Sequence, residues 1–430
     1  MHIIIKIASL ILLTSNIYAQ DIVSDNRDAS HSVREMIETM EESPKKEISE
    51  VNTLQQVLTD GKISGQIKSM YAGYDYAKSQ IKDTYATAIG GRLKYELAEI
   101  NGFNAAAAFY TAQDINFASG DRNKGEQNNE LSSSKGNYTN LAEAYINYKY
   151  DGFNFRGGRQ IIDTPLANSD EIRMIQNTFD AYIVTYALAG FTFMAGNLQK
   201  WQGYDAGLDD RWQNTGINGT WISSISFSNE ILDASAWYYN ISEFSNIFYT
   251  DGSLHYNLNK DIFLHASAQY ISENELNDST INADIYGVMA EIVLHGLGIS
   301  MAYNHVTVAT GKQTFSGFGG GALYTNMDTM ILNNIAIDRD ADSIVSNISY
   351  KINDFKIWYA YGDFRGSANS LGEKVNIIEH NIGFEYNINN DLKFSAIYAR
   401  DNDKIDPNNT QTNWDRVQIN ITYNFEGKNK

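Results

Sequence analysis

The stretch RVQINITYNF, residues 416–425, decides the fold of this chain because two chemical types alternate along it without a break. The apolar residues are Val417, Ile419, Ile421, Tyr423 and Phe425, and the polar residues between them are Gln418, Asn420, Thr422 and Asn424. A period of two is the period of side chains along a β-strand. The stretch is therefore predicted to be a strand with one apolar and one polar face.

The same alternation recurs throughout the chain from Lys62 onward, for example in SIVSNISYKI (343–352) and GRLKYEL (91–97). A soluble β-sandwich also alternates in this way, so the connections between strands are needed to choose the class. Eight short turns lie at about 99–102, 149–152, 188–190, 228–230, 257–261, 294–296, 351–354 and 388–392. Nine longer polar connections lie at about 77–83, 114–138, 161–177, 201–215, 240–246, 273–280, 307–341, 364–373 and 401–413.

Strict alternation of short and long connections is typical of an outer-membrane barrel, whose periplasmic turns are short and whose extracellular loops are long. Strand-length segments of about ten residues and aromatic strand ends also fit a membrane crossing. A closed barrel pairs every backbone group, as the bilayer requires. Residues 62–425 are therefore predicted to be an all-β, closed antiparallel transmembrane barrel of about 18 strands, with both termini in the periplasm and residues 426–430 as a tail.

The N-terminus has the layout of a secretory signal peptide, with a basic residue at Lys6, an apolar run and cleavage after Ala19. A retained membrane anchor is the alternative, but the run is shorter than the roughly 20 residues a spanning helix needs. Residues 20–61 are predicted to be a partly helical or disordered periplasmic extension, with a plug or oligomerisation helix as the alternative. A capping box from Thr53 to Gln56 and a stop at Gly61 predict a helix between them.

Composition excludes several classes of function. The 430 residues include no cysteine, which argues against a disulfide-stapled extracellular fold, and a net charge of −19 disfavours nucleic acid as a partner. None of the histidines adjoins a nucleophile motif, so we do not expect an enzyme. The acidic clusters 338–342 and 401–406 lack the spacing of a calcium loop, and the glycine run 315–324 lacks the features of a phosphate loop, so no metal or cofactor is predicted.

The inward faces of the strands define what such a barrel does. By parity, the residues predicted to face the lumen are Arg92, Lys94, Glu96, Glu143, Asn147, Lys149, Asn154, Arg156, Lys351, Lys356, Lys393 and Ser395. Mixed charges hold water, and barrels of 16 to 18 strands leave room for an aqueous channel. The basic residues among them form a possible track for carboxylate groups, although ordinary solvated lumen residues would look the same.

The third long connection resembles the OprD-like family of outer-membrane porins. The resemblance rests on Gly158-Arg159-Gln160, Thr164-Pro165, Asp170-Glu171-Ile172-Arg173-Met174 and Asn177-Thr178-Phe179-Asp180-Ala181-Tyr182, together with the first strand, Asp60 to Tyr76. It covers essentially all of residues 62–425. The family pattern has a proline soon after Arg-Met, where this chain has Ile175-Gln176.

The resemblance implies passive, selective diffusion through a pore that the third and seventh long loops narrow. It makes Asp170 and Arg173 the first candidates for the constriction, with Pro165 stiffening the loop. The wall residues on the expected solute path are Arg156, Arg92, Lys94, Lys149, Lys351 and Lys393. An arginine offers paired donors to a carboxylate, while loop carboxylates favour a cationic group.

The sequence thus predicts an outer-membrane porin of a Gram-negative bacterium for small hydrophilic solutes such as amino acids, short peptides or organic acids. Its expected partners are membrane lipid, these solutes and the barrel-assembly machinery, and it is expected to be a monomer or a loose homotrimer. The alternative is a structural or adhesive outer-membrane barrel whose lumen is plugged by loops.

Overall fold

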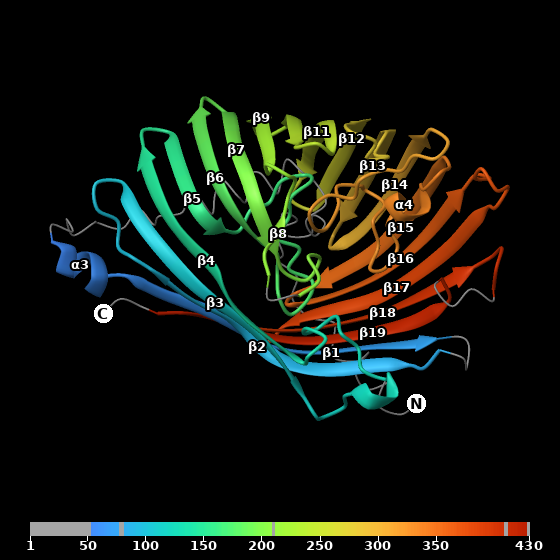
Figure 1. Cartoon of the computed structure of the whole chain (residues 1–430), viewed down its shortest axis with the longest axis horizontal. Coiled ribbons are helices and arrows are strands. Elements are labelled where there is room, and N and C mark those ends of the chain that lie inside the picture. Colours follow the sequence, from blue (N-terminus) through green and yellow to red (C-terminus); the bar gives the residue numbers. More distant parts are fainter. Residues whose placement is uncertain (1–52, 77–80, 209–210, 408–411, 428–430) are drawn as a thin grey trace.

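The computed structural model describes residues 53–76, 81–208, 211–407 and 412–427, and most of them lie in β-strands (Figure 1). The strands are β1 Lys62–Tyr76, β2 Thr84–Glu96, β3 Phe103–Ile115, β4 Asn137–Tyr150, β5 Phe153–Gln160, β6 Thr178–Leu188, β7 Phe191–Gln202, β8 Gln213–Asn214, β9 Thr220–Ser228, β10 Leu232–Ile241, β11 Ser245–Asn259, β12 Ile262–Glu275, β13 Ala283–Leu294, β14 Leu297–Val308, β15 Ala341–Ile352, β16 Phe355–Gly366, β17 Val375–Asn387, β18 Leu392–Asp403 and β19 Trp414–Glu426.

The sheet closes on itself, because β1 pairs with both β2 and β19 and every other long strand pairs with its two neighbours in sequence. All of these pairings are antiparallel. The two-residue β8 pairs with β7 alone, above the point where β7 meets β9. The predicted closed barrel of 18 strands is confirmed for the described residues, with β8 as one extra strand.

The seam between β1 and β19 is long and in register, running from Ser64 opposite Glu426 to Tyr76 opposite Trp414. Its end is tightly fitted: a Cβ added to Gly65 would lie 2.5 Å from the ring of Phe425. Lys62 Nζ also lies 2.8 Å from the Glu426 carboxylate. The seam therefore joins the two ends of the barrel at the rim where the short turns lie.

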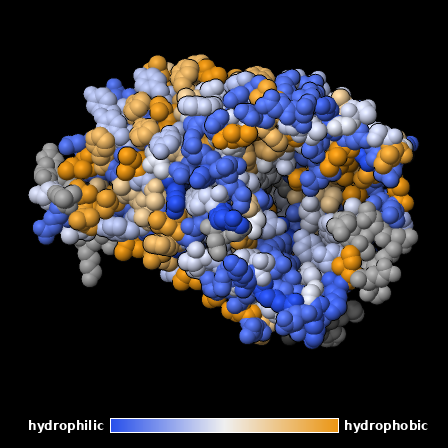
Figure 2. All heavy atoms as spheres, viewed as in Figure 1, coloured by the Kyte–Doolittle hydropathy of each residue, from blue (hydrophilic) through white to orange (hydrophobic). Residues whose placement is uncertain are grey.

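In a soluble protein the apolar face of a strand is buried and the polar face is exposed, and in this barrel the exposure of the two faces is reversed. In β19, Ile419, Ile421 and Tyr423 are between 37% and 46% exposed, whereas Arg416 is fully buried. Exposed large apolar residues recur in the same way on most strands. In Figure 2 apolar residues cover much of the outer surface at the left and upper edges, and hydrophilic residues surround the hollow near the centre. The apolar face thus points away from the barrel axis and the polar face toward it.

Eight short turns occur where the sequence predicts them, at 97–102, 151–152, 189–190, 229–231, 260–261, 295–296, 353–354 and 388–391. Two-residue turns of type I′ need positive φ angles at both positions. Asp151 and Gly152 supply φ values of 44° and 76°, and His295 and Gly296 supply 52° and 83°. Both ends of the barrel sheet, the start of β1 and the end of β19, lie at this same rim.

The long connections also match the prediction, with one exception. The segment 240–246, expected to be a long loop, is a turn of three residues, 242–244. Its polar residues suggested a loop, but Asn240 and Asn246 face each other across the strands, and Asn240 Nδ2 donates to Asn246 Oδ1 at 2.7 Å. Phe244 N closes the turn by donating to Ile241 O at 2.9 Å. Alternation of short and long connections therefore fails at this one position.

Helices are few and short in the described residues: α3 Leu54–Thr59, the 3-10 turn Arg122–Lys124 and α4 Leu332–Ile335. The predicted capping box is present, since Gln56 N donates to Thr53 Oγ1 at 3.2 Å and the Gln56 side chain accepts from Thr53 N at 3.1 Å. No helix in the described part of the chain has the length and apolar character needed to cross a membrane. The predicted signal peptide and residues 20–52 of the predicted extension lie outside the described residues.

Segments of four long connections pack against inward residues of the wall, and green and orange loop segments lie within the ring of strands in Figure 1. They are named here loop 2 (116–136), loop 3 (161–177), loop 4 (203–208 and 211–219) and loop 7 (309–340). Their apolar side chains join the core: Leu166 of loop 3 and Phe318 and Leu332 of loop 7 are buried with inward residues of the wall. The barrel interior is therefore partly filled by chain from the long-loop rim.

Candidate functional site

Loops 3 and 7 are joined to each other by main-chain hydrogen bonds. Asn168 N donates to Phe318 O at 3.1 Å, and Phe318 N donates to Leu166 O at 2.8 Å. The glycines after Phe318 permit this approach, because Gly319 has a φ of 96° and a Cβ there would lie 2.6 Å from Asn168 O. The run 315–324 is thus an ordered contact between two inward loops.

The middle of loop 3 reaches the polar faces of β1 and β2. Gln66 Nε2 donates to Glu171 Oε1 at 2.9 Å, and Lys68 Nζ donates to Arg173 O at 2.9 Å. The Glu171 carboxylate also lies 3.8 Å from Arg92 Nη1 and 3.9 Å from Lys68 Nζ. Loop 3 therefore places an acidic group against a basic patch on the wall.

Gln176, which stands near the position where the family pattern has proline, contacts the same patch. Its Oε1 accepts a hydrogen bond from Arg92 Nη1. A small pocket, part of it open to solvent, lies here, lined by Gln66, Lys68, Gly91, Arg92, Tyr110, Glu171, Met174 and Gln176. This space suits a small polar group rather than a large ligand. The departure from the family pattern thus supplies a polar partner to a wall arginine.

Arg173 belongs to a buried charge cluster that joins three loops to β19. Its Nε lies 3.4 Å from Glu130 of loop 2, its Nη1 donates to Gln418 Oε1 at 3.2 Å, and its side chain is only 6% exposed. Arg416 continues the cluster, because its Nη2 donates to Glu130 Oε1 at 3.1 Å and its Nη1 donates to Asp328 of loop 7. These contacts hold loops 2, 3 and 7 in fixed positions relative to the wall.

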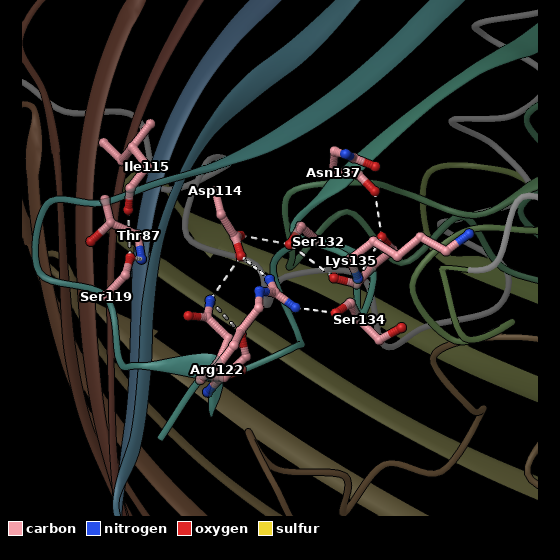
Figure 3. Close-up of polar contacts among 12 residues, drawn as sticks. Thr87, Asp114, Ile115, Ser119, Arg122, Ser132, Ser134, Lys135 and Asn137 are labelled. Carbon is pink, nitrogen blue, oxygen red and sulfur yellow. Dashed lines mark hydrogen bonds and ion pairs between the residues drawn. The ribbon is translucent and has the colours of Figure 1, made fainter. Parts of the chain in front are cut away.

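Loop 2 has its own polar scaffold, shown in Figure 3. Asp114 at the end of β3 accepts hydrogen bonds from the side chains of Arg122 and Ser132, the latter at 2.6 Å. Arg122 also donates to Ser134 O, and Thr87 N donates to Ser119 Oγ at 2.9 Å. Because both ends of loop 2 are fixed in this way, Glu130 is held where it meets Arg173 and Arg416.

Asp170 and Arg173, the two first candidates from the sequence, face different neighbours. Asp170 has a left-handed backbone, with a φ of 45°, and its N donates to Asn168 Oδ1 at 2.7 Å. Burial, followed by the nearby carboxylate of Asp205 in loop 4, raises the pKa of Asp170 to about 7. Asn177 Nδ2 fixes that carboxylate by donating to Asp205 Oδ2 at 2.6 Å. Asp170 therefore belongs to the junction of loops 3 and 4, and Arg173 to the junction with β19.

Four predicted wall residues lie on strands β2, β4 and β5, with β3 between the first two. Lys94 Nζ is 2.9 Å from the Glu143 carboxylate and 5.1 Å from the centre of the Tyr145 ring. Arg156 lies 4.4 Å from the centre of the same ring, and its Nε donates to Asn147 Oδ1 at 3.1 Å. Lys149 follows Asn147 by two residues on β4 and pairs with Asn154 across the sheet. With Arg92 these residues form a continuous basic stretch of wall.

The other two predicted residues lie on a second stretch. Lys351 of β15 is opposite Lys356 of β16, which is opposite Glu385 of β17. Lys393 Nζ of β18 lies 3.0 Å from that Glu385 carboxylate. Lys393 and Lys68 are both register partners of Thr422 on β19, so the second stretch approaches the pocket from the other side.

Loop 7 is fixed to the wall by carboxylates that the sequence analysis did not assign to the site. Met330 N donates to Glu379 Oε2 at 2.7 Å, and Thr329 Oγ1 donates to Asp401 Oδ2 at 2.9 Å. On the other side of the barrel, Phe315 N donates to Glu273 Oε2 at 2.9 Å. Loop 7 is therefore anchored both to β12 and to β17 and β18.

Several residues of the site were missed by the sequence analysis: Lys68, Glu130, Glu171, Asp328 and Arg416. Strand parity already places Lys68 and Arg416 on polar faces, so it would have found both. Glu171 adjoins the chosen Asp170, but no local pattern shows which of the two carboxylates meets the wall. In the described ranges no group of three or more histidine, aspartate or glutamate side chains is arranged to hold a metal ion.

The fold and the interior together define a class: a closed antiparallel barrel of 18 strands with an apolar outside, a charged inside and inward loops, the architecture of large pore-forming barrels. No protein-family model matches the sequence, and no curated protein matches it either. Solved structures do match. The structure of OccK9 (OpdG) from Pseudomonas aeruginosa superimposes with a TM-score of 0.75 at 11% identity, over 86% of this chain and 100% of that one.

Two further porins superimpose in the same way. A BenF-like porin from Pseudomonas fluorescens Pf-5 has a TM-score of 0.74 at 10% identity, over 86% of this chain and 99% of that one. OpdK from Pseudomonas aeruginosa, solved with vanillate, has a TM-score of 0.72 at 14% identity, over 86% of this chain and 99% of that one. These structural neighbours are porins of the OprD family, so the fold implied by the resemblance is confirmed.

Proposed function

We propose that this protein is an outer-membrane porin that lets small hydrophilic solutes carrying a carboxylate diffuse passively through the barrel. The observation that supports this most directly is the meeting of loop 3 with the basic wall, where Glu171 lies against Lys68 and Arg92 inside a closed barrel. A water-filled lumen with such a wall attracts anionic groups, while weak contacts at several points let a solute leave as well as enter.

The constriction in this proposal is formed by loops 3 and 7, which are hydrogen-bonded to each other. Asp170 supplies a titratable charge where loops 3 and 4 meet, and Arg173 shapes the constriction by fixing loop 3 to β19. Solute carboxylates pass along the basic wall residues Arg92, Lys94, Lys149, Arg156, Lys351 and Lys393. The two basic stretches give a solute successive partners toward the short-turn rim.

The exposed apolar surface supports a place in the outer membrane of a Gram-negative bacterium, since only lipid favours so many exposed Ile, Leu, Tyr and Phe side chains. In this orientation the short turns and both termini face the periplasm, and a signal peptide at residues 1–19 directs export. We also propose that the barrel-assembly machinery inserts the protein into the membrane. The protein is then a monomer or a loose homotrimer.

Amino acids, short peptides and organic acids are the proposed solutes. The presence of vanillate in an OpdK structure supports the organic acids among them, because vanillate is a small aromatic carboxylate. The pocket beside Arg92 is small and partly open to solvent, so it offers a polar contact point to the carboxylate end of such a molecule.

Single-channel recording in planar bilayers tests the proposal. The purified protein, shown to be folded by its heat-modifiable migration, is expected to give stable open steps that grow in proportion to salt concentration. The complete absence of open steps from folded, inserted protein would favour the alternative, a structural or adhesive barrel plugged by its loops. Liposome swelling across amino acids, sugars and organic acids then ranks the solutes.

A further inference from the structure

The Glu171 carboxylate occupies an unusual position for a loop residue, because three donors from the wall surround it. Gln66 Nε2 donates to it at 2.9 Å, while Lys68 Nζ and Arg92 Nη1 lie 3.9 Å and 3.8 Å away. The Glu171 side chain is 38% exposed, whereas that of Lys68 is 3% exposed. A partly exposed anion thus covers a buried cation.

Neither Lys68 nor Arg92 is hydrogen-bonded to the Glu171 carboxylate. Both distances exceed the range of a hydrogen bond. The hydrogen bonds of the two cations lead elsewhere: Lys68 Nζ donates to Arg173 O at 2.9 Å, and Arg92 donates to Gln176. An ammonium has three donors and a guanidinium has five, so donor capacity for another anion is present. Glu143 on the wall also attracts Arg92, and Lys393 adds a further positive charge near Glu171.

Glu171 carries its charge at neutral pH. Burial opposes its ionisation, but attraction by Arg92 and Lys68 outweighs burial, so the pKa of Glu171 lies below its usual value. A solute carboxylate has the same charge and the same planar shape as this side chain. The groups that attract the Glu171 carboxylate therefore also attract a solute carboxylate.

We propose that Gln66, Lys68 and Arg92 form a carboxylate-binding site that Glu171 occupies as a tethered competitor, and that a passing carboxylate displaces it. The inference rests on the proposed function, which brings solutes along this wall. A tethered carboxylate has a high effective concentration and therefore weakens binding of a free one. Solutes then exchange instead of remaining bound to two cations, and the site stays neutralised between passages.

The test measures benzoate binding by ligand-observed NMR titration of the folded full-length barrel in detergent. Glu171→Gln keeps the size of the side chain and removes its charge, so benzoate is expected to bind about fivefold to tenfold more tightly than to the wild type. Glu373→Gln is the matched control, because Glu373 is exposed in the connection between β16 and β17 and its loss changes the net charge equally. Benzamide, a neutral molecule of the same shape, tests for charge recognition.

A double variant tests whether Arg92 is the group that binds benzoate. Arg92→Gln added to Glu171→Gln is expected to reverse the gain in benzoate affinity. Unchanged benzoate affinity in Glu171→Gln would overturn the inference, and so would an equal gain for benzamide, which would indicate only a larger pocket. The bilayer recordings decide the proposed function separately: a barrel without open steps that still shows the benzoate gain has the site but no transport.

Discussion

At the scale of single residues, the interior is organised by charges that come from segments far apart in the sequence. Strand parity was sufficient to place Arg92, Lys94 and Lys393 on the polar faces, because alternation is a local property. It could not reveal that Arg173 meets Glu130 and Gln418, since those contacts depend on how whole loops fold. The resemblance drew attention to Asp170 and Arg173, but not to the fact that they serve different junctions.

Asp170 predicts a pH-dependent ion selectivity. With a pKa of about 7, its carboxyl is neutral below that pH and charged above it. The cation-to-anion permeability ratio of the wild type is expected to rise about twofold between pH 6 and pH 8, since one charge about 8 Å from an ion in water contributes about 0.5 kcal/mol. Asp170→Asn should remove this step when reversal potentials are measured in a salt gradient.

The control for this prediction is Asp338→Asn. Asp338 is an exposed loop residue whose pKa is lowered by its hydrogen bond from Ser370, so it stays charged over the same range. This variant should keep the step between pH 6 and pH 8. A step that persists unchanged in Asp170→Asn would remove Asp170 from the ion path.

At the scale of elements, the strands form a wall and the loops are fixed to it by buried ionic contacts. The strands and short turns were predictable because period-two patterns and turn residues are local signals. The short connection 242–244 was not predictable, because the polar residues beside it, Asn240 and Asn246, pair across β10 and β11. The inward course of loops 2, 3 and 7 has no local signal, since it follows from partners on distant strands such as Glu379 and Arg416.

Arg416 predicts a large effect on stability. Replacing it with methionine keeps most of the volume but leaves Asp328 buried without its cation and Glu130 with Arg173 alone. Loss of one partner from a buried ionic cluster costs about 3–5 kcal/mol. Arg416→Met is therefore expected to unfold at clearly lower denaturant concentration than the wild type, as measured by the gel shift between folded and unfolded forms.

A matched substitution at an ion pair whose arginine is exposed provides the comparison. Arg365 lies 2.5 Å from Asp363 and is 66% exposed. Exposed pairs contribute about 0–1 kcal/mol, so Arg365→Met should leave the unfolding midpoint nearly unchanged. Equal effects of the two substitutions would show that the cluster around Arg416 does not hold the loops.

At the scale of the whole molecule, charge is distributed unequally along the barrel axis. Lys149, Lys351 and Lys393 lie within two residues of the short turns. Asp278, Asp340 and Asp406 are exposed in connections at the opposite rim. In the proposed function, a solute entering from the long-loop rim therefore meets carboxylates first and then basic groups.

This unequal distribution of charge along the barrel axis predicts single-channel currents that differ between positive and negative voltages. At 0.1 M KCl the Debye length is about 10 Å, and at 1 M it is about 3 Å. Single-channel currents at equal positive and negative voltages should therefore differ at 0.1 M KCl and converge at 1 M. Lys149→Gln combined with Lys351→Gln should reduce the difference at low salt. Asymmetry that is independent of salt would point to a steric cause instead.

The three-residue turn at 242–244 has a practical consequence for labelling this protein. Its Phe244 ring lies 5.5 Å from the ring of Phe315 in loop 7, so an epitope tag or reporter cysteine inserted there would disturb the loop that crosses the lumen. The connection 367–374 is a better position, because Leu371 at its tip is 79% exposed. In the proposed orientation, a fluorophore attached at that tip would mark the outer rim of the barrel on living cells.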